Sequence, residues 1–127
     1  MSKVVPELQY SAEHEWVGRD GSGPATVGVT AVATEALGDI VYVDLPEVGA
    51  IITAGESCGE IESTKSVSDL YAPVSGEITE INSTVAADPA RINSDPYGVG
   101  WLFKVSVSAD GPLLSAEDYA AANGGEM

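Results

Sequence analysis

Apolar and polar residues alternate with a period of two along several short stretches of the chain, which is typical of strands with one buried face. Residues 77–81 show this alternation, and residues 40–45 form a run rich in β-branched side chains. Clusters of Gly, Pro, Asp and Ser separate such runs. Strands of this kind are predicted at residues 14–17, 25–29, 40–45, 50–52, 77–81 and 101–105, and on both sides of Lys65. The chain is therefore predicted to be mainly β, with its first two strands paired as a hairpin.

Two short helices are predicted from the signals at their ends. Thr30 is a suitable N-cap for a helix over residues 31–37, and Gly38 suits the left-handed conformation that ends it. Ser115 begins a C-terminal helix over residues 115–124, and Asp118, three residues further on, completes a weak form of the capping box. These helices are additions to a chain that is otherwise made of short strands.

The remaining segments are predicted to connect these elements. Residues 1–12 form an extended lead-in interrupted by Pro6, and residues 72–76 form a turn. Residues 82–100 contain two prolines and two glycines and are predicted to be mostly irregular, with one helical turn near residues 89–91. None of these segments is long enough to divide the chain, so residues 1–127 are predicted to fold as a single domain.

The charge of the chain limits its partners. Twenty acidic and five basic residues give a net charge of −15 at pH 7. Nucleic acids and anionic lipid surfaces bind chiefly through Lys and Arg, so neither is an expected partner. An acidic surface either keeps the protein soluble or steers it toward basic patches on other proteins, and the composition leaves both open. Nothing in the sequence indicates a permanent interface, and a monomer is expected.

Targeting signals are also missing from the sequence. No apolar run approaches the roughly 20 residues that a membrane-spanning helix needs. The first residues have neither the apolar segment of a signal peptide nor the Arg- and Ser-rich composition of a transit peptide. A cytoplasmic protein is the simplest expectation.

Few residues offer the chemistry of an enzyme. His14 and Cys58 are the single His and the single Cys of the chain, so a disulfide within the chain and a His/Cys metal cluster are excluded. No phosphate-binding glycine motif occurs. We predict that His14 is a structural hydrogen-bonding residue and that Cys58 is a buried, unreactive thiol, because its nearest charged neighbours, Glu56 and Glu60, disfavour a thiolate.

Lys65 is the exception. It lies between two predicted strands, so we expect it at the tip of a hairpin, and the only other lysines are Lys3 and Lys104. The triplet Gly-Glu-Ile occurs at residues 59–61 and again at 76–78, which suggests two similar strand units flanking this lysine. The neighbours Ser63, Thr64, Ser66 and Ser68 are small and would leave room for a partner to approach. From spacing alone, a solvated surface lysine remains the simpler interpretation.

The residues around Lys65 also match a known pattern. Residues 62–66 (Glu-Ser-Thr-Lys-Ser) and 69–77 (Asp-Leu-Tyr-Ala-Pro-Val-Ser-Gly-Glu) resemble the lipoylation segment of glycine cleavage system H proteins. Further blocks resemble that family in the same order, and together they cover most of the chain: residues 14–17, 27–30, 37–41, 45–49, 92–98 and 100–102. Several separate blocks in register are much more specific than one motif.

The resemblance implies a fold and a function. The fold would be a flattened β-barrel of the lipoyl/biotinyl type (a barrel-sandwich hybrid), with an N-terminal hairpin, a short connecting helix and a C-terminal helix added. Lys65 would carry lipoic acid in amide linkage. The carrier itself would catalyse nothing, and would serve glycine decarboxylase with pyridoxal phosphate, a tetrahydrofolate-dependent aminomethyltransferase and an FAD-dependent dihydrolipoyl dehydrogenase. The cofactor would carry the reacting group while the protein positions it.

The same resemblance implies a cleft that shelters the loaded arm, with acidic groups that favour its protonated amine. This role falls to Glu15 and Asp69. A third family position, where a small polar residue is usual, corresponds to Glu13. Thr64 and Ser66 also replace the Val and Ala more usual beside the lysine, and recognition by lipoylating enzymes is expected to tolerate these small residues.

Four alternatives remain. A biotin carrier domain would have methionines on both sides of the lysine, where this chain has Thr64 and Ser66. A lipoyl domain of a 2-oxoacid dehydrogenase would usually have an Asp directly before the lysine and a Pro/Ala-rich linker, and neither is present. A lipoate relay that donates its cofactor to other proteins stays open, as does an unmodified binding module with the same fold.

Overall fold

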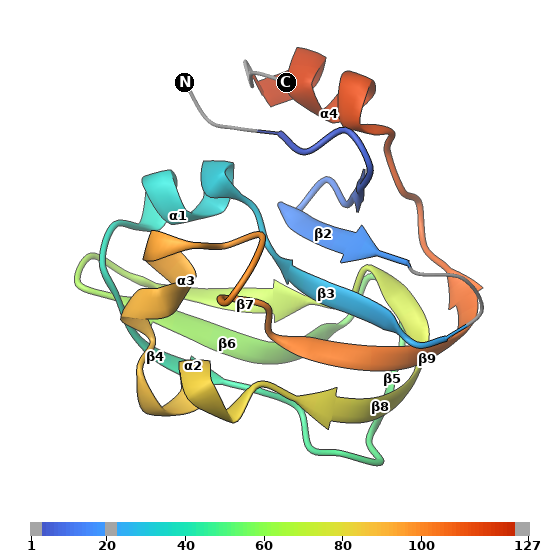
Figure 1. Cartoon of the computed structure of the whole chain (residues 1–127), viewed down its shortest axis with the longest axis horizontal. Helices are drawn as coiled ribbons and strands as arrows, with labels where there is room; N and C mark the ends of the chain where they lie inside the picture. The colour runs from blue at the N-terminus through green and yellow to red at the C-terminus, as the bar shows by residue number, and fades with distance from the viewer. Residues whose placement is uncertain (1–3, 20–22, 124–127) are drawn as a thin grey trace.

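The computed structural model describes residues 4–19 and 23–123. It is mainly β, as predicted, and its strands form two sheets (Figure 1). The larger sheet has six antiparallel strands, in the spatial order β1 (Gln9–Tyr10), β2 (Glu15–Gly18), β3 (Ala25–Val29), β9 (Phe103–Asp110), β8 (Val74–Ile81) and β5 (Ile51–Ile52). The smaller sheet has three antiparallel strands, in the order β4 (Ile40–Asp44), β6 (Ser57–Ser63) and β7 (Val67–Tyr71).

The main core lies between these two sheets. Alternate residues of the strands point into it, which is why runs with a period of two were a usable signal. Phe103, Ile78 and Leu70 are almost completely buried there, and they come from both sheets. Helix residues such as Val85 and Ile92 close one end of the core. Burial of this kind supplies most of the free energy that holds the sheets together.

Both predicted helices are present. In α1 (Ala31–Leu37) the Thr30 hydroxyl accepts a hydrogen bond from the Ala33 amide at 3.3 Å, and Gly38 ends the helix with a φ of 78°. In α4 (Ala116–Asn123) the Ser115 hydroxyl accepts from the Asp118 amide at 3.1 Å. The predicted final residue, Gly124, lies outside the described residues.

Three predicted boundaries were wrong. Residues 74–76 belong to β8 and not to a turn, because Gly76 serves the close approach of two strands: a Cβ there would lie 2.1 Å from the Ser106 carbonyl oxygen. The last strand begins at Phe103 rather than at Trp101, whose carbonyl accepts a hydrogen bond from the Asn82 side chain at 2.7 Å. That strand extends to Asp110, since it pairs along β8 as far as Val74.

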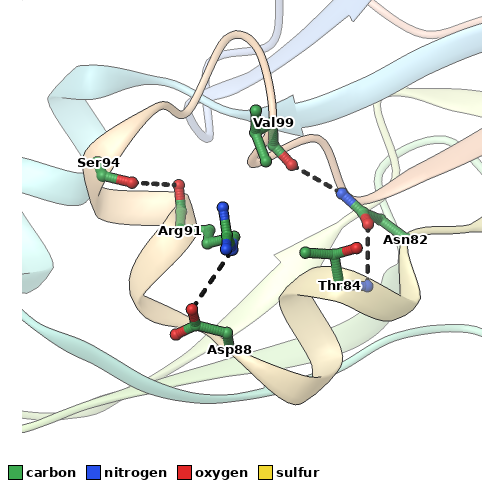
Figure 2. A network of polar contacts seen from close by, with 6 residues as sticks. All are labelled: Asn82, Thr84, Asp88, Arg91, Ser94 and Val99. Carbon is green, nitrogen blue, oxygen red and sulfur yellow. Dashed lines mark hydrogen bonds and ion pairs between the residues drawn. The ribbon is translucent and has the colours of Figure 1, made fainter.

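Residues 82–100 are more regular than expected. They contain two helices, α2 (Ser83–Ala87) and α3 (Ala90–Ser94). The Asn82 side chain caps α2 by accepting from the Thr84 amide at 3.1 Å, and it donates to the Val99 carbonyl at 2.9 Å (Figure 2). One asparagine therefore begins a helix and fastens the loop that follows the next one. The helical turn predicted near residues 89–91 corresponds to the beginning of α3, whereas α2 was missed because a helix of five residues shows no clear periodicity in the sequence.

The Gly-Glu-Ile repeat has a structural counterpart. Gly59 lies in β6 of the smaller sheet and Gly76 in β8 of the larger one, each at a shift in strand register. A Cβ at Gly59 would lie 2.2 Å from the Asp44 carbonyl oxygen, which matches the crowding at Gly76. Both glycines therefore allow a neighbouring backbone to approach at an irregular point of a strand.

A second, smaller core joins the two ends of the chain. Tyr10 and Tyr119 are fully buried and stack with their ring centroids 4.6 Å apart. Trp16, Val4 and Ala116 complete this cluster. The expected lead-in, residues 1–12, is therefore partly structured: within residues 4–12 it supplies β1 and half of this core. Helix α4, at one end of the molecule in Figure 1, contacts β1, where Tyr119 stacks on Tyr10.

Candidate functional site: a lysine hairpin and an acidic cleft

Lys65 lies at a hairpin tip, as predicted. Strands β6 and β7 pair antiparallel with Glu62 opposite Val67, which leaves four residues, 63–66, at the turn. Three of these, Thr64, Lys65 and Ser66, are exposed. The lysine amine therefore has access to solvent on a support that is continuous with a sheet.

Ser63 organises this tip from inside. Its side chain is largely buried, and its hydroxyl accepts hydrogen bonds from the amides of Lys65 and Ser66, each at 3.2 Å. Its own amide donates to the Ser66 carbonyl at 2.8 Å. From the sequence, Ser63 was expected to leave room for a partner. Instead, its side chain fixes the turn. A serine before a tight turn is a recognisable signal for such hydrogen bonds.

The segment between α1 and β4 supports the tip from the side. The Thr64 amide donates to the Asp39 carbonyl at 3.0 Å. A Cβ added to Gly38 would lie 3.3 Å from Lys65 Cε, so the aliphatic part of the lysine lies against this glycine. Figure 1 shows the β6–β7 loop beside the chain that leaves α1. The tip is therefore held both by the β6–β7 ladder and by the segment between α1 and β4.

Asp69 lies on the outer, exposed face of the smaller sheet, together with Tyr71 two residues further along β7. The Tyr71 hydroxyl donates to the Asp69 carboxylate at 3.3 Å, and the charge of that carboxylate raises the pKa of Tyr71. Glu13 and Glu15 add smaller contributions in the same direction. All three predicted carboxyl groups therefore act on the pKa of Tyr71.

A cleft of about 320 Å³ opens at the far end of β7, and Glu13 lies in its wall. Its lining consists of Ser11, Glu13, Gly55, Tyr71, Ala72, Pro73 and Pro112. Asp69 and Glu15 do not line this cleft directly. Asp69 reaches its wall through Tyr71, so the structure brings Glu13 and Tyr71 together and leaves Asp69 at the edge.

Glu15 lies behind the cleft wall. Its side chain is 2% exposed, and its Oε1 accepts a hydrogen bond from the Ser11 hydroxyl at 2.5 Å. Burial raises the pKa of Glu15 to about 8, although the bonds from Ser11 and from the Tyr71 backbone act in the opposite direction. The carboxyl group is therefore mostly protonated and neutral at pH 7.

The turn that carries Glu13 and Glu15 is fixed by His14. This residue has a φ of 74°, which is rare for a side chain of its size. Its Nδ1 lies 2.6 Å from the Tyr119 hydroxyl, which in turn lies 2.8 Å from the Thr30 hydroxyl. The prediction that His14 is a structural hydrogen-bonding residue is confirmed. Its partner on α4 lies 105 residues away and could not be found from the sequence.

Other candidate chemistry is weak in the described part of the chain. Cys58 is half-buried rather than buried as predicted. Burial, followed by the charge of Glu15 and not of the predicted Glu56 and Glu60, raises its pKa to about 12, which agrees with an unreactive thiol. Residues 4–19 and 23–123 contain no group of three His, Cys, Asp or Glu side chains that could hold a metal ion. None of the helices in these ranges is long and apolar enough to cross a membrane.

The spacing between the lysine and the cleft sets a length requirement. At about 3.3 Å per residue, β7 places Asp69 about 7 Å and Tyr71 about 13 Å beyond Val67, where the strand leaves the turn that carries Lys65. A lysine side chain is too short to cover this distance. Communication between the tip and the cleft therefore requires an extension of Lys65 or a movement of the hairpin.

Two packed sheets with a lysine at a hairpin tip have the architecture of the lipoyl-type fold, a barrel-sandwich hybrid. The sequence profile described as "Glycine cleavage H-protein" matches residues 8–124. The chain belongs to this family.

Relatives support this membership along the whole chain. A glycine cleavage system H protein of Beutenbergia cavernae is 61% identical over 123 residues, covering 97% of this chain and 98% of its own. One of Streptomyces coelicolor is 59% identical over 116 residues, covering 91% and 93% respectively. The crystal structure of a glycine cleavage system H protein from Mycobacterium marinum superimposes with a TM-score of 0.92 at 54% identity, covering 95% of this chain and 99% of that one.

Proposed function

We propose that residues 1–127 form the lipoyl-bearing carrier of a glycine cleavage system, with lipoic acid in amide linkage to Lys65. The observation that carries the proposal is the geometry of the tip. Lys65 is exposed, its neighbouring amides are held by Ser63 and Asp39, and the surrounding turn is otherwise free for an enzyme to approach. This is what an attachment point for a prosthetic arm requires.

The group attached to Lys65 would supply the reacting sulfur atoms, and the chain would only carry and shelter them. Glycine decarboxylase with pyridoxal phosphate would load an aminomethyl group, and a tetrahydrofolate-dependent aminomethyltransferase would remove its one-carbon unit with release of ammonia. An FAD-dependent dihydrolipoyl dehydrogenase would restore the disulfide. Tethering keeps the cofactor at a high effective concentration at each of these enzymes, and the carrier is monomeric and non-catalytic in this scheme. We place it in the cytoplasm.

The cleft with Glu13 in its wall fits a shelter for the loaded arm. A lipoyl arm on Lys65 would be long enough to reach beyond the lysine side chain toward the cleft, where Glu13 and Tyr71 lie in the wall and Asp69 bonds to Tyr71. The carboxyl groups of Glu13 and Asp69 would attract the protonated amine of an aminomethyl group. Glu15 would contribute as a neutral hydrogen-bonding group until an ammonium group approaches, because a nearby positive charge lowers the pKa of a carboxyl group and favours its ionisation.

Mass spectrometry of the intact chain tests the proposal. The protein is produced in cells that make lipoate, or incubated with lipoate, ATP and a purified lipoate–protein ligase. The wild type should gain the mass of one lipoyl group, and Lys65→Arg, which keeps the charge, should gain none. Lys104→Arg is the matched control and should be modified like the wild type. An unmodified wild type after incubation with the ligase would overturn the proposal, and a biotin-sized increment would move the protein to a different class of carrier.

A further inference from the structure

The side chain of Asn93, on α3, joins two backbone groups on the segment between α1 and β4. Its Oδ1 accepts a hydrogen bond from the Ile40 amide at 2.9 Å, and its Nδ2 donates to the Gly38 carbonyl at 2.8 Å. These partners lie 53 and 55 residues away in the sequence. Both halves of one amide are thus used on either side of a single residue, Asp39.

Each of the three residues that Asn93 brackets contacts the lysine tip. The Asp39 carbonyl accepts from the Thr64 amide at 3.0 Å. Gly38 lies against the aliphatic part of Lys65, and Ile40 pairs with Ser63, which organises the turn. Neither of the two hydrogen bonds made by the Asn93 side chain involves a residue of the tip. Asn93 fixes the short segment against which the tip rests.

Residues 38–40 receive few hydrogen bonds from regular secondary structure. Gly38 ends α1, so its carbonyl has no partner within the helix. The pairing of β4 with β6 shifts register between Ile40 and Tyr42, which interrupts the ladder beside the tip. Asn93 therefore supplies hydrogen bonds at the place where the helix has ended and the ladder is irregular.

Helix α3, which carries Asn93, is anchored to the rest of the fold. Ile92, the neighbour of Asn93, is completely buried in the main core. Arg91 and Asp88 form an ion pair at 3.4 Å at the beginning of α3, and the Ser94 hydroxyl donates to the Arg91 carbonyl at 3.3 Å (Figure 2). The helix is short, but it is anchored on its inner face, so a side chain on it can hold a neighbouring segment in place.

We propose that Asn93 is a positioning residue for Lys65, acting through residues 38–40. The inference rests on the proposed function, since it assigns Asn93 a part in presenting the lysine for lipoylation. A tip that is already ordered loses less conformational entropy when a lipoylating enzyme binds it. Loss of the bridge should therefore weaken productive docking and leave the chemistry at the lysine amine unchanged, which raises KM while kcat stays the same.

Three variants test this role. Asn93→Leu keeps the approximate shape and removes both hydrogen bonds, and Asn93→Asp keeps the acceptor for Ile40 but loses the donor for Gly38. Ile92→Val is the matched control, because it weakens the packing of α3 and keeps the bridge. Steady-state lipoylation by a purified lipoate–protein ligase should give a KM raised about 10-fold in Asn93→Leu and about 3-fold in Asn93→Asp, with kcat unchanged.

Amide hydrogen exchange supplies a readout that a merely structural role would not move. Exchange of the Thr64 amide should accelerate about 10-fold in Asn93→Leu, while the amides of β3 and β9 keep their protection. In Ile92→Val the Thr64 amide and the KM should match the wild type after correction for global stability. Equal KM and equal Thr64 exchange in Asn93→Leu and Ile92→Val would overturn the inference.

The two proposals fail in different ways. If the wild type accepts no lipoate, the proposed function is wrong, and Thr64 exchange alone then decides whether Asn93 orders the tip. If the wild type is lipoylated and Asn93→Leu is lipoylated with the same KM, the positioning role is wrong and the carrier function stands.

Discussion

The lysine tip and the turn that carries Glu13 and Glu15 are built in opposite ways. At the tip, exposed side chains rest on backbone hydrogen bonds to Ser63 and Asp39. At the acidic turn, a buried carboxyl group, a left-handed His14 and a tyrosine from α4 hold one another in place. The exposed side chains at the tip, Thr64, Lys65 and Ser66, can therefore change at little cost in stability. Changes at the acidic turn alter stability and function together.

The largest expected effect separates function from stability at the tip. Lys65→Ala should abolish glycine decarboxylation in a reconstituted system of the partner enzymes, because no attachment point remains. Its free energy of unfolding should stay within about 0.5 kcal/mol of the wild type, as for other exposed positions. Urea unfolding measured by circular dichroism, beside the decarboxylation assay, checks both. Full activity in this variant would contradict the carrier function.

At the acidic turn, in contrast to the tip, a substitution should change the free energy of unfolding, and the change should depend on pH. The pKa of Glu15 is raised from 4.5 to about 8, so between these values the folded state holds a proton that the unfolded state has released. Stability contributed by the neutral carboxyl is fully present below about pH 4.5 and is lost as the pH rises through about 8. The slope for one proton is at most about 1.4 kcal/mol per pH unit.

Glu15→Gln isolates this effect. The glutamine cannot ionise, so the variant should lose less stability than the wild type between pH 5 and pH 8. The difference between the two curves of unfolding free energy against pH is the quantity to measure, because it cancels the titration of most other groups. Parallel curves would mean that Glu15 is ionised in the folded protein at neutral pH.

Tyr119→Phe tests how α4 holds the acidic turn. Burial lowers the pKa of His14, so its neutral Nδ1 can accept from the Tyr119 hydroxyl, which in turn accepts from Thr30. Removing this hydroxyl takes a hydrogen-bond partner from the partly buried His14 imidazole and from the buried Thr30 hydroxyl. The expected cost is about 1–3 kcal/mol. Tyr42→Phe, at a tyrosine that is 53% exposed, is the control and should change the unfolding free energy by less than about 0.5 kcal/mol.

This contrast also explains what could be predicted from the sequence. The tip follows from local information: two strands with a period of two, small polar residues between them and one lysine. The acidic turn depends on contacts between distant residues, such as His14 with Tyr119, and no local pattern encodes these. Asn93 belongs to the same class, since its partners lie beyond any sequence window. The beginning of β8 was predicted wrongly because glycine is favoured both in turns and where two strands approach closely, and Gly76 serves the close approach.

The smallest expected effect concerns the edge of the cleft. Asp69 is exposed and reaches the wall through its hydrogen bond with Tyr71, so its charge acts on a sheltered arm mainly through solvent. Asp69→Asn should therefore speed spontaneous loss of the aminomethyl group from the loaded carrier by only a few-fold, and Glu13→Gln, in the wall itself, should speed it more. Release of ammonia from each loaded variant, followed over time at low and at high salt, measures this. Because the interaction is electrostatic, the difference between Asp69→Asn and the wild type should shrink at high salt. Rates equal to the wild type in both variants would show that the carboxylates do not shelter the arm, and the cleft would then act by excluding water alone.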